Sequence, residues 1–171
     1  MGDTRISVIF GLPPNKEKIS YRLFFGIIEY ELKIKNINFS VEKMMDFELA
    51  IMMAAKEIWP GIIIQGCRFH WGQCLQRFFS KSNMIPLGER SDEFLKIFHC
   101  CLGLPMVREL ELEDCVKDLE EVNLEDDVLN QAKQQLLDCI KYEWIFGNFP
   151  PNIWSCFGHI EDCKLLVLMG S

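Results

Sequence analysis

Asp46 is the residue of this 171-residue chain whose type and position best suit catalytic chemistry. It follows an apolar run that ends at Met45 and precedes a helical pattern that starts at Phe47. A carboxylate at such a place can hold a divalent metal ion, because Mg²⁺ takes oxygen ligands. It can also act as a plain helix N-cap, worth about 1 kcal/mol. Spacing alone favours the cap, so a metal-binding role depends on the residues around it.

Cysteine and histidine form two further groups with metal-ligand spacing. Cys67 and His70 read Cys-x-x-His, and Cys74 follows one helical turn later. Three later residues repeat the spacing: Cys156, His159 and Cys163. A zinc ion needs four nitrogen or sulfur ligands in tetrahedral geometry, and each group supplies three, so only a shared site would be complete. Cys67, His70 and Cys74 are therefore zinc candidates without a finished site.

The hydrophobic pattern predicts an α/β first half and an all-helical second half. Strands and helices alternate up to about residue 80, which is typical of a parallel sheet. In the first predicted helix, Ile19, Leu23, Ile27 and Tyr30 recur as its apolar face. The predicted strands are 6–10, 39–45 and 62–66, and the predicted helices are 16–34, 47–58, 70–79, 91–102, 113–121 and 125–146.

The order of strand, Asp46, helix, strand, Cys67-x-x-His70 and helix resembles the Mutator-like (MULE) transposase domain. The specific block is Asp-Phe-Glu-Leu-Ala at residues 46–50, which is similar to the family's Asp-Phe-Glu-x-Ala. The resemblance implies a ribonuclease-H-like nuclease fold, with Asp46 as the second acid of an Asp-Asp-Glu site that binds Mg²⁺ or Mn²⁺. It also implies that Cys67 and His70 support the active-site region structurally.

Weaker similarity extends over about residues 6 to 155. It includes the stretch 10–16 with Tyr21, and the stretch 142–145 with the later Pro150, Pro151 and Trp154. We therefore expect three parts: a partial ribonuclease-H-like transposase core over 1–82, a helical insertion region over 83–155, and a divergent tail over 156–171.

Two of the family's three acids have no counterpart in these residues. The Asp-Gly-Thr strand and the Thr-Asn-Asn-x-x-Glu helix are missing, and Glu161 is not in such a motif. Carboxylates must hold two metal ions about 4 Å apart for this chemistry, and one aspartate cannot do so. We expect no strand cleavage by this chain alone and no cofactor for it. The alternatives are a protein-interaction or regulatory module that uses the helical half, and a nuclease completed by another chain.

The composition limits the classes of partner and the cellular compartments that we expect. The net charge of −7 argues against strong DNA binding, because a protein that grips many phosphates is usually basic. The aromatic residues between 59 and 79 could stack on bases, but we expect them to form core. We find no membrane span and no signal peptide, so we expect a nuclear or cytoplasmic protein that is not secreted. Exposed apolar surface predicts self-association or a protein partner.

Overall fold

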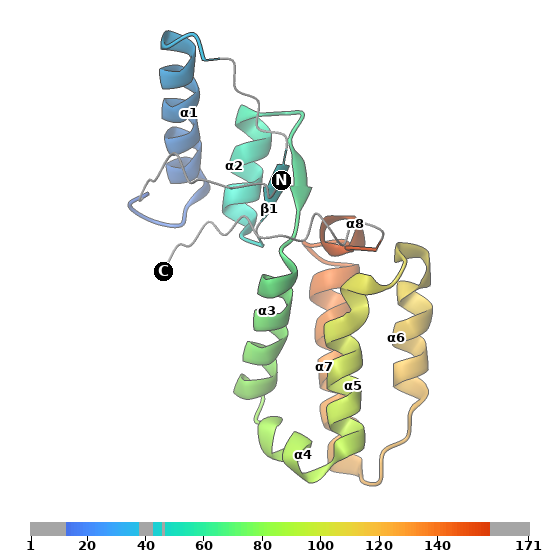
Figure 1. Cartoon of the computed structure of the whole chain (residues 1–171). Helices are drawn as coiled ribbons and strands as arrows, with labels where there is room; N and C mark the ends of the chain where they lie inside the picture. The colour runs from blue at the N-terminus through green and yellow to red at the C-terminus, as the bar shows by residue number, and fades with distance from the viewer. Residues whose placement is uncertain (1–12, 38–42, 46, 158–171) are drawn as a thin grey trace, which may run out of the picture. The chain divides into compact units, whose positions relative to one another are not determined.

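The computed structural model describes residues 13–37, 43–45 and 47–157, with the backbone alone at 43–45. The chain divides into two compact units (Figure 1). Of the described residues, the first unit contains 13–37, 43–44 and 48–63, and the second contains 45, 47 and 64–157. The predicted strand 6–10 and most of the tail after residue 155 lie outside the described residues.

Two helices form the first unit, α1 (Lys18–Ile34) and α2 (Leu49–Ile58). Their contact is aromatic: the ring of Phe25 lies 5.1 Å from that of Trp59, at the end of α2. Beside it, Lys18 and Arg22 of α1 both pair with Glu57 of α2. The helix predicted over 16–34 is thus confirmed.

The face that α1 buries is not the predicted one. Tyr21 and Phe25 are buried with Ser20, whereas the predicted apolar row of Ile19, Leu23, Ile27 and Tyr30 is exposed. The cause is that α1 carries large apolar side chains on two sides, and periodicity does not tell which side meets a neighbour.

The prediction of an α/β, ribonuclease-H-like core is wrong. The described residues contain two paired strands of only three residues each, β1 (Lys43–Met45) and β2 (Ile63–Gln65). In β2 the side chain of Ile63 is exposed, so this apolar run does not build a sheet core. The main hydrophobic core lies between helices instead. The expected order of strand, helix and strand is present over 43–65, but it does not amount to a layered sheet.

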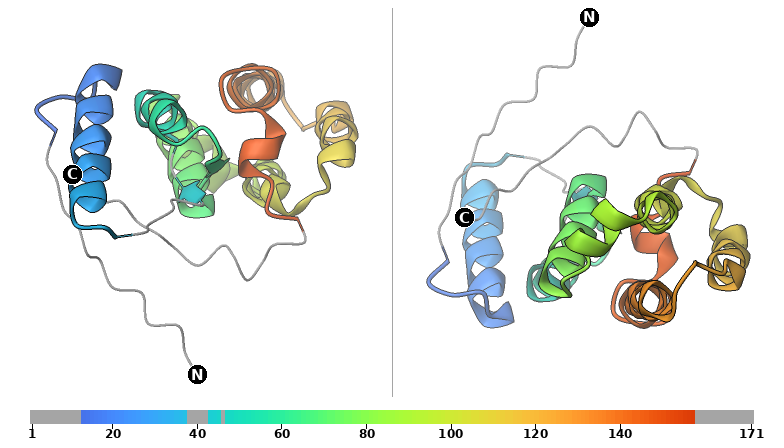
Figure 2. Two further views of the ribbon diagram at one scale, coloured as in Figure 1. Left: turned by 90° about the horizontal axis from the view of Figure 1, so that it is seen from above. Right: turned by 90° about the horizontal axis from the view of Figure 1, so that it is seen from below.

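The second unit is a bundle of four long helices that run side by side (Figures 1 and 2). These are α3 (Arg68–Lys81), α5 (Asp92–Gly103), α6 (Leu112–Glu121) and α7 (Asp127–Ile140). Shorter elements join and extend them: α4 (Ile85–Arg90), the 3₁₀ turns η1 (Leu104–Met106) and η2 (Glu109–Glu111), the π-helical turn η3 (Lys141–Ile145) and α8 (Pro151–Trp154). The predicted helices at 91–102 and 113–121 are confirmed within about a residue.

Local signals explain where the bundle helices begin. Ser91, the expected N-cap of α5, accepts a hydrogen bond from the backbone N–H of Phe94 at 3.3 Å. Asp126 caps α7 in the same way, because its carboxylate accepts from Leu129 N at 2.8 Å. The helix predicted over 125–146 is therefore confirmed. After Ile140 it continues as the π-helical turn η3, which ends before Pro150.

Candidate functional site

Asp46, the predicted catalytic acid and metal ligand, lies outside the described residues. Its neighbours in sequence are described and bear on the alternative role. The N-cap position of α2 is Glu48 rather than Asp46, and Glu48 makes no side-chain capping bond. Glu48 instead pairs with Lys16 at 3.6 Å. Both roles of Asp46, as a metal ligand and as a cap of this helix, stay predictions.

Cys67 and His70 open α3, directly after β2. Cys67 is the N-cap residue and is buried, and His70 is half-buried in the first turn beside the ring of Phe69. Cys74 is half-buried one turn later. Among the described residues, no three side chains of His, Cys, Asp or Glu gather into a group that could hold a metal ion. His159 and Cys163, which form the second group together with Cys156, lie outside that part of the chain.

An aromatic cluster in the second unit joins the sequence blocks that follow Asp46 and His70. The ring of Trp71 stacks on that of Trp154, with centroids 4.6 Å apart, and lies 4.8 Å from Trp144. Phe47 packs edge-on against Trp144 at 4.9 Å. Phe149 completes the cluster against Phe47 and Trp144. The residues next to Asp46 and His70 therefore share one contact, the indole of Trp144.

Hydrogen bonds fix two points of this aromatic cluster. The Nε1–H of Trp154 lies 2.8 Å from both the Trp144 and the Phe149 carbonyl oxygens and donates to them. The backbone N–H of Gly66 donates to the carbonyl of Ile153 at 2.5 Å. A side chain at Gly66 would have no room, because its Cβ would stand 2.0 Å from a ring carbon of Phe47. The segment before Cys67 is thus held tightly against the end of the bundle.

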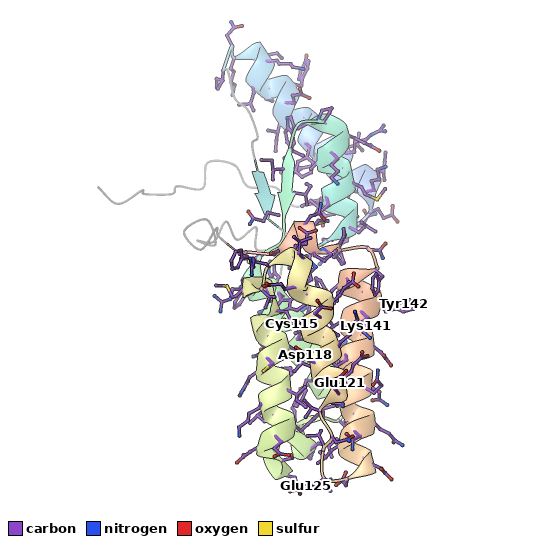
Figure 3. All side chains as sticks on the ribbon, turned by 90° about the vertical axis from the view of Figure 1, so that its right-hand side faces the viewer. Cys115, Asp118, Glu121, Glu125, Lys141 and Tyr142 are labelled. Atoms are coloured by element: carbon purple, nitrogen blue, oxygen red, sulfur yellow. The ribbon has the colours of Figure 1, made fainter. Side chains whose placement is uncertain are left out.

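A shallow groove of about 540 Å³ lies on the second unit between the end of α3 and the α7–η3 segment. Its lining residues are Phe78, Ser82, Gln135, Asp138, Cys139, Tyr142 and Glu143. Tyr142 stands at its edge with 82% of its side chain exposed, and Figure 3 shows it projecting outward next to Lys141. A π-helical turn such as η3 is often found at functional sites, because it re-aims side chains.

The groove is acidic and not nucleophilic. Asp138 and Glu143 are its charged lining residues, and no lysine or arginine lines it. Burial raises the pKa of the Cys139 thiol, and the charges of Glu143 and Cys74 add to that effect. Because a thiol reacts as its thiolate, Cys139 is not an activated nucleophile here. The arrangement suits binding rather than covalent chemistry.

The acidic stretch 109–121 is mostly a solvated helix face, as its pattern predicts. Asp118 and Glu121 lie along α6 among the exposed residues (Figure 3). Its last turn is tied to α7 through Glu120, which pairs with Lys141. Lys133 is buried and donates to the carbonyls of Glu120 and Val122. These contacts join the end of α6 to α7 and the start of η3.

Sequence reasoning did not identify the groove or the buried Lys133. Tyr142 and Glu143 lie in the stretch 142–145 of weaker similarity, and Cys139 belongs to neither group of residues with metal-ligand spacing. The signal that could have identified Lys133 is its place between Ala132 and Leu136 in the sequence, on the face of the helix that is otherwise apolar and buried. The prediction that the aromatics between 59 and 79 form core is confirmed for Trp71 and Phe79, which are buried, and is wrong for Phe69, which is 53% exposed.

Compared with known proteins, the chain matches no family model, no curated protein and no solved structure. In the part of the chain that the structure describes, no helix has the length and apolar character needed to cross a membrane.

Proposed function

We propose that these 171 residues derive from a MULE transposase and do not act as a nuclease by themselves. The observation that carries the proposal is the aromatic cluster. Phe47, Trp71 and Trp154 come from the three stretches in which the sequence resembles that family, and they meet around Trp144. Blocks that descend from one domain should pack together, and this cluster is consistent with that. The proposal needs only this shared core and does not require a ribonuclease-H-like sheet.

The derivation is tested in the genomic sequence on both sides of the stretch that encodes these 171 residues. We expect the missing Asp-Gly-Thr block upstream and the Thr-Asn-Asn-x-x-Glu block downstream, intact or decayed. Flanking sequence with neither block, in several related genomes, would contradict the derivation.

The absence of nuclease activity is tested with supercoiled plasmid DNA and Mg²⁺ or Mn²⁺. One aspartate of a three-acid site cannot hold two metal ions, so we expect no nicking by the purified chain. The matched control is Asp46→Ala, which should behave like the wild type. Metal-dependent nicking that disappears in Asp46→Ala would overturn this part of the proposal.

A second function, protein binding, is favoured by the groove beside Tyr142. Its lining is apolar at Phe78 and Cys139, acidic at Asp138 and Glu143, and free of basic residues. An exposed tyrosine at the edge of a groove is a common anchor for a partner. The chemistry fits an amphipathic helix that presents leucine-like residues to the floor and lysine or arginine to the acidic edge.

Binding in the groove is tested with a labelled helical peptide of leucine and lysine, and with its leucine and glutamate counterpart. We expect the basic peptide to bind by fluorescence anisotropy and the acidic peptide not to bind. Tyr142→Ala and Glu143→Lys should each weaken binding about tenfold. Phe157→Ala, an exposed aromatic away from the groove lining, is the control. Equal binding by all variants would exclude the groove.

A further inference from the structure

A continuous row of exposed apolar side chains runs along α1. It consists of Ile19, Leu23, Ile27, Tyr30 and Ile34, each between 49% and 63% exposed. Spacings of three and four place these residues on one face of the helix. We call this row the α1 stripe. Because α1 already buries Tyr21 and Phe25 elsewhere, the stripe is a second apolar face, and a helix with two such faces normally has two neighbours.

The charged residues of α1 form ion pairs and are not part of the stripe. Glu29 pairs with Lys33 at 2.9 Å, and Glu31 pairs with Lys35 at 3.9 Å. Lys18 and Arg22 pair with Glu57 of α2. The stripe itself contains no charged residue. Its occupant is therefore apolar, which excludes a nucleic acid backbone and favours another helix.

The stripe is complementary to itself when two copies run in opposite directions. Its midpoint is the peptide bond between Gly26 and Ile27. Ile19 and Ile34 lie equally far from this midpoint on either side, and so do Leu23 and Tyr30. In an antiparallel pair of helices, a residue faces the residue equally far beyond the midpoint of the other copy. Ile19 then meets Ile34 of the second copy, and Leu23 meets Tyr30.

Gly26 provides the space that the middle of such a pair needs. A Cβ placed on Gly26 would meet no atom within 4 Å, so the surface above it is open. In the antiparallel arrangement this opening receives Ile27 of the second copy. A small residue opposite a large one allows two helices to approach closely, as in other tightly packed helix pairs.

Charge supports the same arrangement. Arg22 and Glu29 lie on the same flank of the stripe, because they are seven residues apart on a helix. A two-fold axis across an antiparallel pair brings like flanks together, so Arg22 of each copy lies on the same side as Glu29 of the other. The two are offset by two residues, about 3 Å along the helix axis, which their long side chains can span. The present partner of Arg22, Glu57, is 3.8 Å away and also pairs with Lys18. Arg22 can therefore contact Glu29 of the second copy without leaving Glu57 unpaired.

We propose that the chain forms a symmetric dimer through the α1 stripe, with two copies of α1 antiparallel about an axis near Gly26 and Ile27. This interaction goes beyond the proposed function, because it uses neither the aromatic cluster nor the groove. An interface of one helix per copy is at the small end of specific contacts, so its occupancy depends on protein concentration.

The first test is sedimentation equilibrium of the full chain over a roughly hundredfold range of concentration. We expect a monomer–dimer equilibrium whose dissociation constant rises about tenfold or more in Ile27→Glu, because a charge would enter the apolar contact. Val128→Glu is the matched control, as Val128 is 55% exposed on α7 and Ile27 is 62% exposed. Both variants should keep the wild-type circular dichroism spectrum. A wild type that stays monomeric would overturn the proposal. A lower melting temperature for Ile27→Glu in that case would show that another segment of the same chain covers the stripe.

The second test addresses the orientation. Arg22→Glu and Glu29→Arg should each weaken the dimer about three- to tenfold, since each puts like charges opposite one another across the axis. The double variant Arg22→Glu, Glu29→Arg should restore it. A dimer that is insensitive to all three variants would show that the copies are not antiparallel at this register.

Discussion

The indole of Trp71 stacks on that of Trp154 at a centroid distance of 4.6 Å, and within the described residues only the Trp154 ring has a hydrogen-bond partner for its N–H. Trp154 Nε1 donates to two backbone carbonyls, whereas Trp71 Nε1 is buried without a hydrogen-bond partner in the described part of the chain. Both side chains are almost completely buried. Substituting each ring in turn therefore separates the contribution of aromatic packing to stability from that of hydrogen bonding.

The first prediction compares Trp154→Phe with Trp71→Phe. Both changes remove a similar volume, but only Trp154→Phe leaves the carbonyls of Trp144 and Phe149 without this donor. We expect it to lower the free energy of unfolding by about 1–3 kcal/mol more than Trp71→Phe, as measured by urea denaturation. Equal losses would mean that the two hydrogen bonds of Trp154 contribute nothing net.

The second prediction concerns Gly66. A Cβ there would lie 2.0 Å from the ring of Phe47, and the backbone cannot retreat, because Gly66 N–H is bonded to Ile153. We expect Gly66→Ala to destabilise the protein by about 1–3 kcal/mol or more. Gly61→Ala is the control, since no atom lies within 4 Å of its added carbon. If thermal melts showed the two variants to be equally stable, Phe47 would not be fixed beside Gly66.

The sequence predicts the helices well because their signals are local. Ser91 as the N-cap of α5 and the long periodic pattern that becomes α7 can be read within a single segment. The α/β, ribonuclease-H-like expectation was wrong. It rested on short apolar runs that alternate with helical patterns and on short matching blocks, and the two described strands are only three residues long, too short to build a sheet core. What those blocks do share is Trp144, and that contact joins residues too distant in sequence for any local pattern to show.

The buried face of α1 and the groove beside Tyr142 were also hard to predict, because both depend on contacts between segments that are distant in sequence. Ile19 and Leu23 have the helical spacing of a buried face, and Tyr21 and Phe25 have the same spacing. The position of α2 determines which of the two faces is buried. The groove beside Tyr142 takes residues from α3 and from α7–η3, which no spacing rule connects.

The third prediction concerns the buried Lys133. Its ammonium group donates to the Glu120 and Val122 carbonyls, which end α6 and have no partner within that helix. Lys133→Met keeps the apolar stem and removes these bonds, so we expect a loss of about 1–3 kcal/mol in the free energy of unfolding. Lys117→Met is the control, because that exposed lysine pairs with Asp114 of its own helix, a surface ion pair that contributes little, and little change is expected. A loss of similar size in both would point to net charge rather than to the buried contacts.

The last prediction is a pH dependence that arises where α6 meets α7. Lys141 donates to the carboxylate of Glu120, and this hydrogen bond lowers the pKa of Glu120 below its ordinary value of 4.5, with a smaller contribution from Gln134. A carboxyl group whose pKa is lower in the folded state binds protons more weakly there than in the unfolded chain. Its contribution to stability is therefore complete above the ordinary pKa and is lost as the pH falls through the lowered one.

The variant Glu120→Gln removes that contribution. We expect its melting temperature to lie below that of the wild type at pH 7, and the difference to shrink as the pH falls below 4.5. Glu121→Gln is the matched control. The Glu121 carboxylate is next to Glu120 in sequence, is exposed and has no ion pair among the described residues. Differential scanning calorimetry from pH 7 down to pH 3 measures both, at about one-unit steps. A gap between Glu120→Gln and the wild type that stays constant across this range would show that Lys141 does not hold the charge of Glu120 in the folded protein.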